Sequence, residues 1–267
     1  MSITEHALRT PWQVTLSVWK ALFLREFMTR VTKDRLAWFW MLFEPIAIIG
    51  VMVGVRTYVM GRSRHIAGAE FVPWLLVGLL AFFLFRENMM RSIGAVDENR
   101  KLFSYRQVKP IDPVFVRCFL EGMIKTFVFA CFIAFGMLLG VELFLDDFLI
   151  ALFAWISLWL LGIGVCLVLS AVSALAREVG KITRIMSLPL LIVSGVIIPL
   201  NFLPHDILQW LLFNPIVHGL ELLRVAFFAS YQPVDGFSVL YLWGWILGAL
   251  VLGLILHIRF EVRLKAL

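Results

Sequence analysis

Charged residues are scarce in this chain. Asp, Glu, Lys and Arg make up 16% of its 267 residues, whereas they make up about 25% of an ordinary soluble domain. Hydrophobic residues make up 61%, above the roughly 45 to 50% that is usual for soluble proteins. The composition therefore indicates an integral membrane protein. About six membrane spans leave no room for a soluble domain of ~100 residues, so we expect any nucleotide-hydrolysing engine to be a separate chain.

The sequence motifs of common catalytic sites are also missing. The chain contains no HExxH, no GxSxG and no Walker A pattern GxxxxGK[ST], which disfavours a metalloprotease, a serine hydrolase and a nucleotide hydrolase. Its five histidines are scattered, and a polyprenol-dependent transferase would need acidic clusters for metal and pyrophosphate. We therefore expect no catalytic residue, no metal site and no cofactor in this chain.

Cysteine is rare as well. The three cysteines, Cys118, Cys131 and Cys166, fall at or inside apolar segments and do not show the spacing of metal ligands. We expect them to pack as small hydrophobic residues.

Positive charge is distributed unequally between the connecting segments. Of the 24 Lys and Arg residues, 19 fall in residues 1–35, 86–117, 177–184 and 259–267. Because each span carries the chain across the membrane, the expected spans put these four segments on the same side. Since cytoplasmic loops carry the excess of Lys and Arg, we expect both termini in the cytoplasm. The N-terminus lacks the pattern of a signal peptide, so the first span is expected to remain uncleaved. The net charge of +6 thus indicates topology and does not indicate a nucleic-acid partner.

The apolar runs predict one all-α integral membrane domain over residues 1–267 with six transmembrane helices. The expected spans are residues 36–59, 71–85, 114–141, 148–176, 185–199 and 239–258. Before the first span, aromatic residues recur at helical spacing over residues 11–33, with Thr10 as the helix cap and Pro11 at the first position. This segment carries too many charges to be buried. We expect an amphipathic helix on the cytoplasmic surface of the membrane.

The longest expected cytoplasmic connection, residues 96–113, mixes charged residues with Leu102, Phe103 and Tyr105. A purely polar segment would suffice to join two spans, so the apolar side chains indicate a contact surface. Two partners are possible: a cytoplasmic protein, or the chain's own surface helix.

Glu44, Glu121 and Lys125 are charged residues within the expected spans. An ionised Glu44 would cost roughly 2.5 to 3.5 kcal/mol or more at that depth, so it should face a partner or a water-filled space. Glu121 and Lys125 stand four residues apart, and they form either a self-satisfied ion pair or part of a hydrated path. The aromatic cluster that includes Trp40 and Phe43 is most simply an interfacial belt.

The apolar stretch of residues 188–228 is interrupted by glycine, proline and asparagine. It predicts a span ending near Pro199, a short helix over residues 206–213, and another over residues 215–228 with Asn214 as its cap and Pro215 at its first position. Apolar helices of this length lie in the membrane interface, or enter the bilayer and return.

One polar line follows the last of these helices. His218, Glu221 and Arg224 recur at three-residue spacing on an otherwise apolar helix. They suit either a snorkelling interfacial helix with a Glu221–Arg224 pair or a gate at the outer mouth of a transport path.

This arrangement resembles the permease subunits of ABC type 2 exporters, in particular those that export capsular polysaccharide. The resemblance covers nearly the whole chain. It rests on KDRLAWFWMLFEP (residues 33–45), ENRKLFSYRQVKPIDP (residues 98–113), and SGVIIPLNFLP followed by NPIVHGLELLR (residues 194–224).

The resemblance implies a homodimer of permeases that works with two copies of a separate ATPase, which binds ATP and Mg. Residues 96–113 would hold the coupling helix seated on the ATPase, and residues 200–230 would form a re-entrant outer hairpin. The implied ATPase-coupling residues are Asp97, Asn99, Arg100, Leu102, Phe103 and Tyr105. The implied substrate path is lined by Trp40, Phe43, Glu44, Glu121 and Lys125. The implied outer gate consists of Asn214, Pro215, His218, Glu221 and Arg224.

The resemblance also implies a place in the cell envelope. The chain would reside in the bacterial inner membrane and move a lipid-linked, often acidic polysaccharide. A periplasmic co-polymerase and an outer-membrane channel would continue the route. The alternatives are an O-antigen or teichoic acid exporter with the same fold, then a drug or lipid exporter, and last an intramembrane enzyme.

Overall fold

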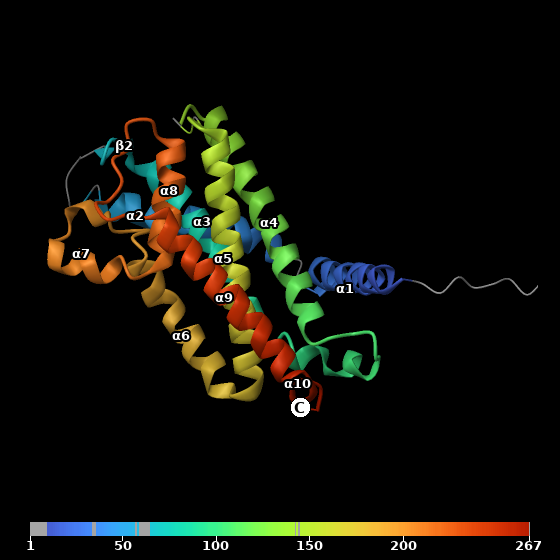
Figure 1. Cartoon of the computed structure of the whole chain (residues 1–267). Coiled ribbons are helices and arrows are strands. Elements are labelled where there is room, and N and C mark those ends of the chain that lie inside the picture. Colours follow the sequence, from blue (N-terminus) through green and yellow to red (C-terminus); the bar gives the residue numbers. More distant parts are fainter. Residues whose placement is uncertain are drawn as a thin grey trace, which may run out of the picture.

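A computed structural model describes residues 10–33, 36–56, 58, 65–141, 143 and 145–266 of the chain. These residues are mostly helical (Figure 1). The α-helices are α1 Pro11–Lys33, α2 Ala37–Val55, α3 Phe71–Ser92, α4 Ile111–Leu138, α5 Phe148–Leu175, α6 Arg177–Val193, α7 His205–Leu211, α8 Pro215–Phe227, α9 Val239–Arg259 and α10 Glu261–Ala266. Two 3-10 segments, η2 Asp97–Ser104 and η3 Leu200–Phe202, and a hairpin of β1 His65–Ile66 with β2 Ala69–Glu70 complete the described elements.

Four of the described helices, α3, α4, α5 and α9, are long and apolar enough to cross a membrane. Helix α2 is apolar but shorter, and α7 and α8 reach spanning length only as a pair that is bent by 101°. A helical membrane protein is therefore confirmed, whereas the number of six spans stays a prediction. Residues 57 and 59 of the expected first span lie outside the described part of the chain.

One connection differs from the sequence prediction. Residues 177–184 were expected to form a cytoplasmic turn before a span starting at residue 185, but they are the first two turns of α6. Arg177, Glu178 and Lys181 all favour helix, and a charged helix end can project from the membrane into water. The helix therefore starts earlier than the apolar run on which the prediction depended.

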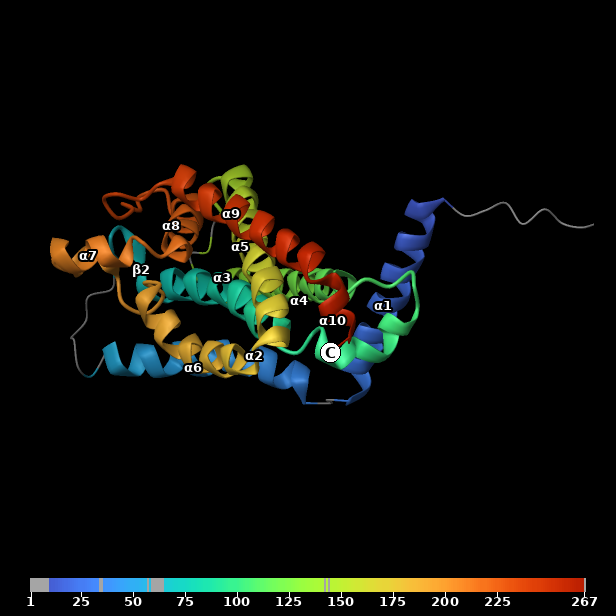
Figure 2. The same ribbon diagram turned by 60° about the horizontal axis from the view of Figure 1, so that its bottom comes forward.

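The centre of the bundle is formed by α3 and α5, with α4, α8 and α9 packed around them (Figures 1 and 2). Helix α9 crosses α5 closely because glycine removes the side chain at the crossing. A Cβ atom on Gly164 would lie 2.9 Å from the Cβ of Ala249 and 3.0 Å from the backbone nitrogen of Leu250. Close contacts of this kind are typical of small residues in membrane helix pairs.

Helix α1 projects sideways from one end of the bundle, beside the segment that contains η2 (Figures 1 and 2). Its start is fixed as the sequence predicts: the Gln13 amide donates to Thr10 Oγ1 at 3.4 Å, and the Thr10 amide donates to Gln13 Oε1 at 3.0 Å. This reciprocal pair is a capping box. Val18 and Leu22 bury their side chains against a second hydrophobic cluster at that end of the bundle.

Candidate functional site

The bent pair of α7 and α8, called the hairpin below, turns where Asn214 and Pro215 start α8. Asn214 Oδ1 accepts from the Ile216 amide at 3.1 Å, so the predicted N-cap is confirmed. The amide nitrogen of the same side chain donates to Ser194 Oγ at 2.9 Å, at the end of α6. One side chain therefore caps α8 and ties it to α6.

The His218 ring joins the hairpin to the start of α9. The Ser238 amide donates to His218 Nδ1 at 3.0 Å, so Nδ1 has no proton. His218 Nε2 lies 2.9 Å from the carbonyl oxygen of Leu212 and must donate to it. These two bonds select one neutral tautomer of the ring. They also join α8 to the segment before it, at Leu212, and to the segment after it, at Ser238.

The Glu221 carboxylate is fully buried and accepts several hydrogen bonds. Arg224 Nη1 donates to Oε1 at 3.0 Å, and the Tyr231 hydroxyl lies 3.0 Å from both oxygens. The Val234 amide donates to Oε2 at 3.1 Å. Burial raises the pKa of the Tyr231 hydroxyl to about 12, so the phenol keeps its proton and acts as a donor. The segment after α8 is thus folded around this carboxylate.

The Arg224 guanidinium extends the same network to α3 and α6. Its Nη2 donates to the Gly195 carbonyl at 3.0 Å and lies 3.4 Å from the Val196 carbonyl oxygen. Its central carbon lies 3.8 Å from the centroid of the Trp74 ring, a cation–π contact. Gly195 has φ +68°, a conformation that suits glycine and that turns the chain after α6. A Cβ on Gly78 would lie 2.5 Å from Arg224 Nη2, so this glycine makes room for the guanidinium.

The polar line on α8 is therefore internal. His218, Glu221 and Arg224 are each at most 2% exposed, and α3, α5 and α9 of the same chain surround the helix. The hypothesis of a snorkelling interfacial helix is wrong for these side chains, although its Glu221–Arg224 pair is present. Their role as a gate stays a prediction.

At the other end of the bundle, a cavity of about 610 Å³ lies among α1, α2, α3, α4 and α6. Four of the five residues expected along a substrate path line it together: Trp40, Glu44, Glu121 and Lys125. Phe43 is outside the lining and stacks on Phe39, with ring centroids 5.2 Å apart.

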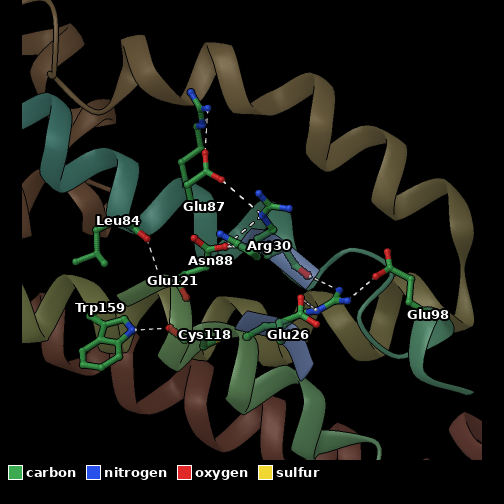
Figure 3. Close-up of polar contacts among 12 residues, drawn as sticks. Glu26, Arg30, Leu84, Glu87, Asn88, Glu98, Cys118, Glu121 and Trp159 are labelled. Atoms are coloured by element: carbon green, nitrogen blue, oxygen red, sulfur yellow. Dashed lines mark hydrogen bonds and ion pairs between the residues drawn. The ribbon is translucent and has the colours of Figure 1, made fainter. Parts of the chain in front are cut away.

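Glu121 does not rely on Lys125 for its counter-charge. Its carboxylate pairs with Arg30 from α1 and lies 3.2 Å from Arg91 Nε of α3. Figure 3 shows Arg30 and Glu121 meeting below Glu87. The ion pairs connect α1 to α3 and α4, which the four-residue spacing of Glu121 and Lys125 did not indicate.

Glu44 also finds its partner on another helix. Arg86 Nη2 lies 2.9 Å from Glu44 Oε1 and 3.2 Å from Glu87 Oε1. The expectation that Glu44 faces a partner is therefore confirmed, and the partner is a cation of α3.

Arg117 joins α1 to the connection before α4. Its Nε lies 3.0 Å from Glu26 Oε1 of α1, and its Nη2 pairs with Glu98 of η2. Sequence reasoning missed Arg117, as it missed Arg30 and Arg91. The available signal was their position at the charged inner ends of expected helices.

Two of the expected coupling residues face α1. Asn99 is buried, accepts from Arg25 and donates to the Ala95 carbonyl at 2.7 Å. Phe103 is buried in the cluster that contains Val18. For these two side chains, the hypothesis of packing against the protein's own helix is confirmed.

The other face of the same segment is open. Tyr105 is 60% exposed, and with Leu102 it lines a groove of about 400 Å³ between α1 and the η2 connection. Asp97 and Arg100 pair with each other at 2.9 Å and stay partly exposed. This face is exposed and could contact a partner protein.

Comparison with known proteins gives a consistent result. The family described as ABC-2 type transporter matches residues 17–228. The chain is 36% identical over 249 residues to the polysialic acid transport protein KpsM of Escherichia coli, covering 93% of this chain and 95% of that protein. It is 26% identical over 210 residues to the capsule polysaccharide export inner-membrane protein CtrC of Neisseria meningitidis serogroup A, covering 79% and 78%. It is 26% identical over 245 residues to BexB of Haemophilus influenzae, which carries the same description, covering 90% of each chain.

Proposed function

Because the chain belongs to the ABC-2 type transporter family, we propose that it is the permease subunit of an ATP-driven exporter of lipid-anchored capsular polysaccharide. It is a transport subunit of the bacterial inner membrane and not an enzyme. The observation that carries the proposal is the extent of similarity to KpsM, which covers 93% of this chain and 95% of its relative. If the two proteins shared only one domain, part of at least one chain would lie outside the matched region.

The engine in this proposal is a separate ATPase that binds ATP and Mg. Its docking surface is the exposed face of residues 96–113, around Leu102 and Tyr105. The contacts support transmission, because Arg117 ties this connection and α1 to the start of α4. A force applied at η2 would therefore reach α1 and α4 together.

The permease in this proposal is a homodimer with six spans in each protomer: α2, α3, α4, α5, α6 and α9. Helices α7 and α8 form the re-entrant hairpin of residues 200–230. Both termini are cytoplasmic. Apolar side chains on α2 and α6 are exposed, among them Phe39, Ile185 and Leu188, and they offer a face for the second copy. The path for the polysaccharide would run along this seam, past Trp40, Phe43 and Glu44 and then Glu121 and Lys125.

The outer hairpin would act as a gate that moves as one piece. Its polar groups are satisfied within one chain: Asn214 by α6, His218 by the flanking connections, and Glu221 and Arg224 by each other and by backbone groups. Opening by internal unfolding would leave buried charges unpaired, which is costly. These bonds are kept if α7 and α8 move together with the turn at Ser194 and Gly195 and the segment up to Ser238. A periplasmic co-polymerase and an outer-membrane channel would receive the polysaccharide after it has passed the gate.

The test is complementation of a capsulated bacterium from which the permease and ATPase genes have been deleted. The chain is supplied with its ATPase, surface polysaccharide is measured with a capsule-specific antibody, and the ATPase is assayed for copurification. We expect surface polysaccharide to return only when both proteins are present. Return of O-antigen or teichoic acid instead of capsule would assign the other cargo class, and return without the ATPase would refute the proposal.

A further inference from the structure

The His218 ring connects three consecutive helices of the chain. Its Nε2 lies 2.9 Å from the carbonyl oxygen of Leu212, the residue that follows α7. Its Nδ1 accepts at 3.0 Å from the amide of Ser238, the N-cap of α9. Because His218 itself belongs to α8, one side chain joins the end of α7, the first turns of α8 and the start of α9.

The bond to Ser238 requires an unprotonated Nδ1. A proton there would turn the acceptor into a donor, and this donor would face the Ser238 N–H, which is also a donor. The proton would also add positive charge at the N-terminus of α9, where the helix dipole already has its positive end. His218 is 2% exposed, so water cannot solvate that charge. Protonation of the ring is therefore incompatible with this contact between α8 and α9.

The charged groups on α8 itself do not relieve this conflict. Glu221, one turn further along the helix, attracts a cation at the ring, but its carboxylate already meets Arg224 and the Tyr231 hydroxyl. From α9, the Tyr241 ring has its centroid 4.9 Å from that of the His218 ring. The Tyr241 hydroxyl donates to the carbonyl oxygen of another residue and carries no charge.

Helices α3 and α5 also pack against α8, and neither brings a charge to the ring. Helix α3 has no titratable residue before Arg86, and α5 has no acidic or basic residue. Asp147, the N-cap of α5, lies beside Ala226 at the opposite end of α8. The titratable residues of α7 and of the connection to α9 that remain are exposed: His205, Asp206 and Asp235. Among the described residues, no carboxylate is placed to accept from a protonated Nδ1.

We propose that His218 is a pH-sensitive clamp, which holds the hairpin to the start of α9 at neutral pH and releases it in acid. The released arrangement can bind one proton more than the clamped one, so acid shifts the equilibrium toward release. Histidine is the side chain whose ordinary titration falls between about pH 5 and 8. The clamp is therefore kept as the pH rises and lost as the pH falls.

The consequence for transport rests on the proposed function, in which the hairpin is the outer gate and moves together with the segment up to Ser238. Loss of the bond from Ser238 separates the hairpin from α9, so a movement of one is no longer transmitted to the other. We therefore expect export to fall when the medium outside the cell is acidified. The clamp itself is a property of this chain alone.

Hydrogen exchange of the purified, full-length permease in detergent tests the clamp directly. The Ser238 amide reports the bond to His218, and the Val234 amide, which donates to Glu221 Oε2, is the reference from the same connection. Exchange is followed by mass spectrometry with fragmentation that resolves single residues, at about pH 7 and about pH 5, across the range in which histidine titrates. It is expressed as a protection factor, which corrects for the effect of pH on the intrinsic rate.

In the wild type, protection of Ser238 should fall by ~10-fold or more on acidification, since a one-proton equilibrium shifts by up to ~10-fold per pH unit, and protection of Val234 should stay within ~2-fold. Unchanged protection of Ser238 would overturn the clamp. An equal fall at Val234 would also overturn it, because the group that titrates would then be Glu221.

Two neutral substitutions separate the two bonds of the ring. His218→Asn keeps a carbonyl oxygen close to the position of Nδ1, so Ser238 should stay protected at both pH values. His218→Gln keeps a donor close to the position of Nε2, so it retains the bond to Leu212 but should leave Ser238 unprotected at both. The matched control is His205→Asn, which removes an exposed histidine of α7 and should keep the wild-type dependence on pH.

The same variants give results that contradict the clamp. A fall at Ser238 in His218→Asn equal to that of the wild type would show that another group titrates. Protection of Ser238 in His218→Gln equal to that of the wild type at about pH 7 would show that the ring is not its acceptor.

An export assay in cells keeps the proposed function distinct from the clamp. Surface polysaccharide should fall by ~3-fold or more when the medium is acidified around the wild type, and it should not depend on pH over this range in His218→Asn. Export by the wild type that does not depend on pH, although Ser238 is released, would overturn the link to the gate. If the wild type exports nothing at neutral pH, the proposed function fails, whereas hydrogen exchange still decides the clamp.

Discussion

Glu221 and Arg224 face each other one turn apart on α8, with Arg224 Nη1 3.0 Å from Glu221 Oε1 and both side chains 1% exposed. Each charge also meets groups outside α8: Glu221 accepts from Tyr231, and Arg224 donates to the Gly195 carbonyl. The pair therefore holds the hairpin, the turn after α6 and the segment before α9 in one arrangement.

Loss of either charge should destabilise the hairpin strongly. Arg224→Met leaves the Glu221 carboxylate buried without its cation, which typically costs about 3 to 5 kcal/mol. Tyr231→Phe removes one donor to the same carboxylate and should cost about 1.5 to 3 kcal/mol. Thermal unfolding of the purified chain in detergent measures both. Combining Arg224→Met with Glu221→Leu should recover part of the loss, and a single Arg224→Met variant as stable as the wild type would contradict the network.

Glycine substitutions test the packing of α5 on α9. Gly164→Ala should destabilise by about 1 to 3 kcal/mol, because its Cβ would lie 3.0 Å from the backbone nitrogen of Leu250. Gly248→Ala on α9 is the matched control, since a Cβ there meets nothing within 4 Å. It should be neutral or slightly stabilising, as alanine favours helix over glycine by about 1 kcal/mol. Equal shifts in the thermal midpoint for the two variants would show that the helices cross elsewhere.

The two faces of η2 should respond differently to truncation. Phe103→Ala removes a buried ring from the contact with α1 and should cost about 3 kcal/mol of stability. Tyr105→Ala should leave stability unchanged, because the ring is exposed, but it should weaken copurification of the ATPase. Leu102→Asp should also weaken copurification. Full retention of the ATPase by both Tyr105→Ala and Leu102→Asp would refute the docking face.

Cysteine labelling tests the orientation. A cysteine at Gln209 on α7 should react with a membrane-impermeant maleimide added to spheroplasts, and one at Ser104 should react only after the membrane is opened. Both positions are exposed. Gly219 is unsuitable as a third position, because a Cβ there would lie 2.4 Å from Leu158 Cδ2. The reverse pattern of labelling would invert the proposed topology.

Features that depend on neighbouring residues in the sequence could be predicted. The caps at Thr10 and Asn214 follow from residues within three positions of the helix start, and both are present. The breaks in residues 188–228 were predictable for the same reason, since proline and glycine act on the local backbone. The start of α6 at Arg177 was missed because hydropathy marks where a helix enters apolar surroundings and does not mark where it begins.

Features that depend on tertiary contacts could not be predicted. The sequence spacing suggested that Glu121 pairs with Lys125, but Arg30 lies 91 positions away in the chain and is the nearer partner in space. Likewise, the spacing of the polar residues on α8 was compatible with a helix at the membrane surface. In the structure, α3, α5 and α9 enclose these residues. The resemblance implied four of the residues that line the cavity among α1, α2, α3, α4 and α6, but the arginines that pair with its carboxylates depend on the fold.

The most direct measurement of the central claim is transport into inside-out membrane vesicles that contain this chain and its ATPase. Lipid-anchored polysaccharide from the producing bacterium is added outside, and the fraction that becomes protected from a polysaccharide-degrading enzyme is measured. The account predicts protection that needs ATP, Mg²⁺ and both proteins, and that falls with Tyr105→Ala. Protection without the ATPase, or no protection when every component is present and the ATPase copurifies, would contradict it.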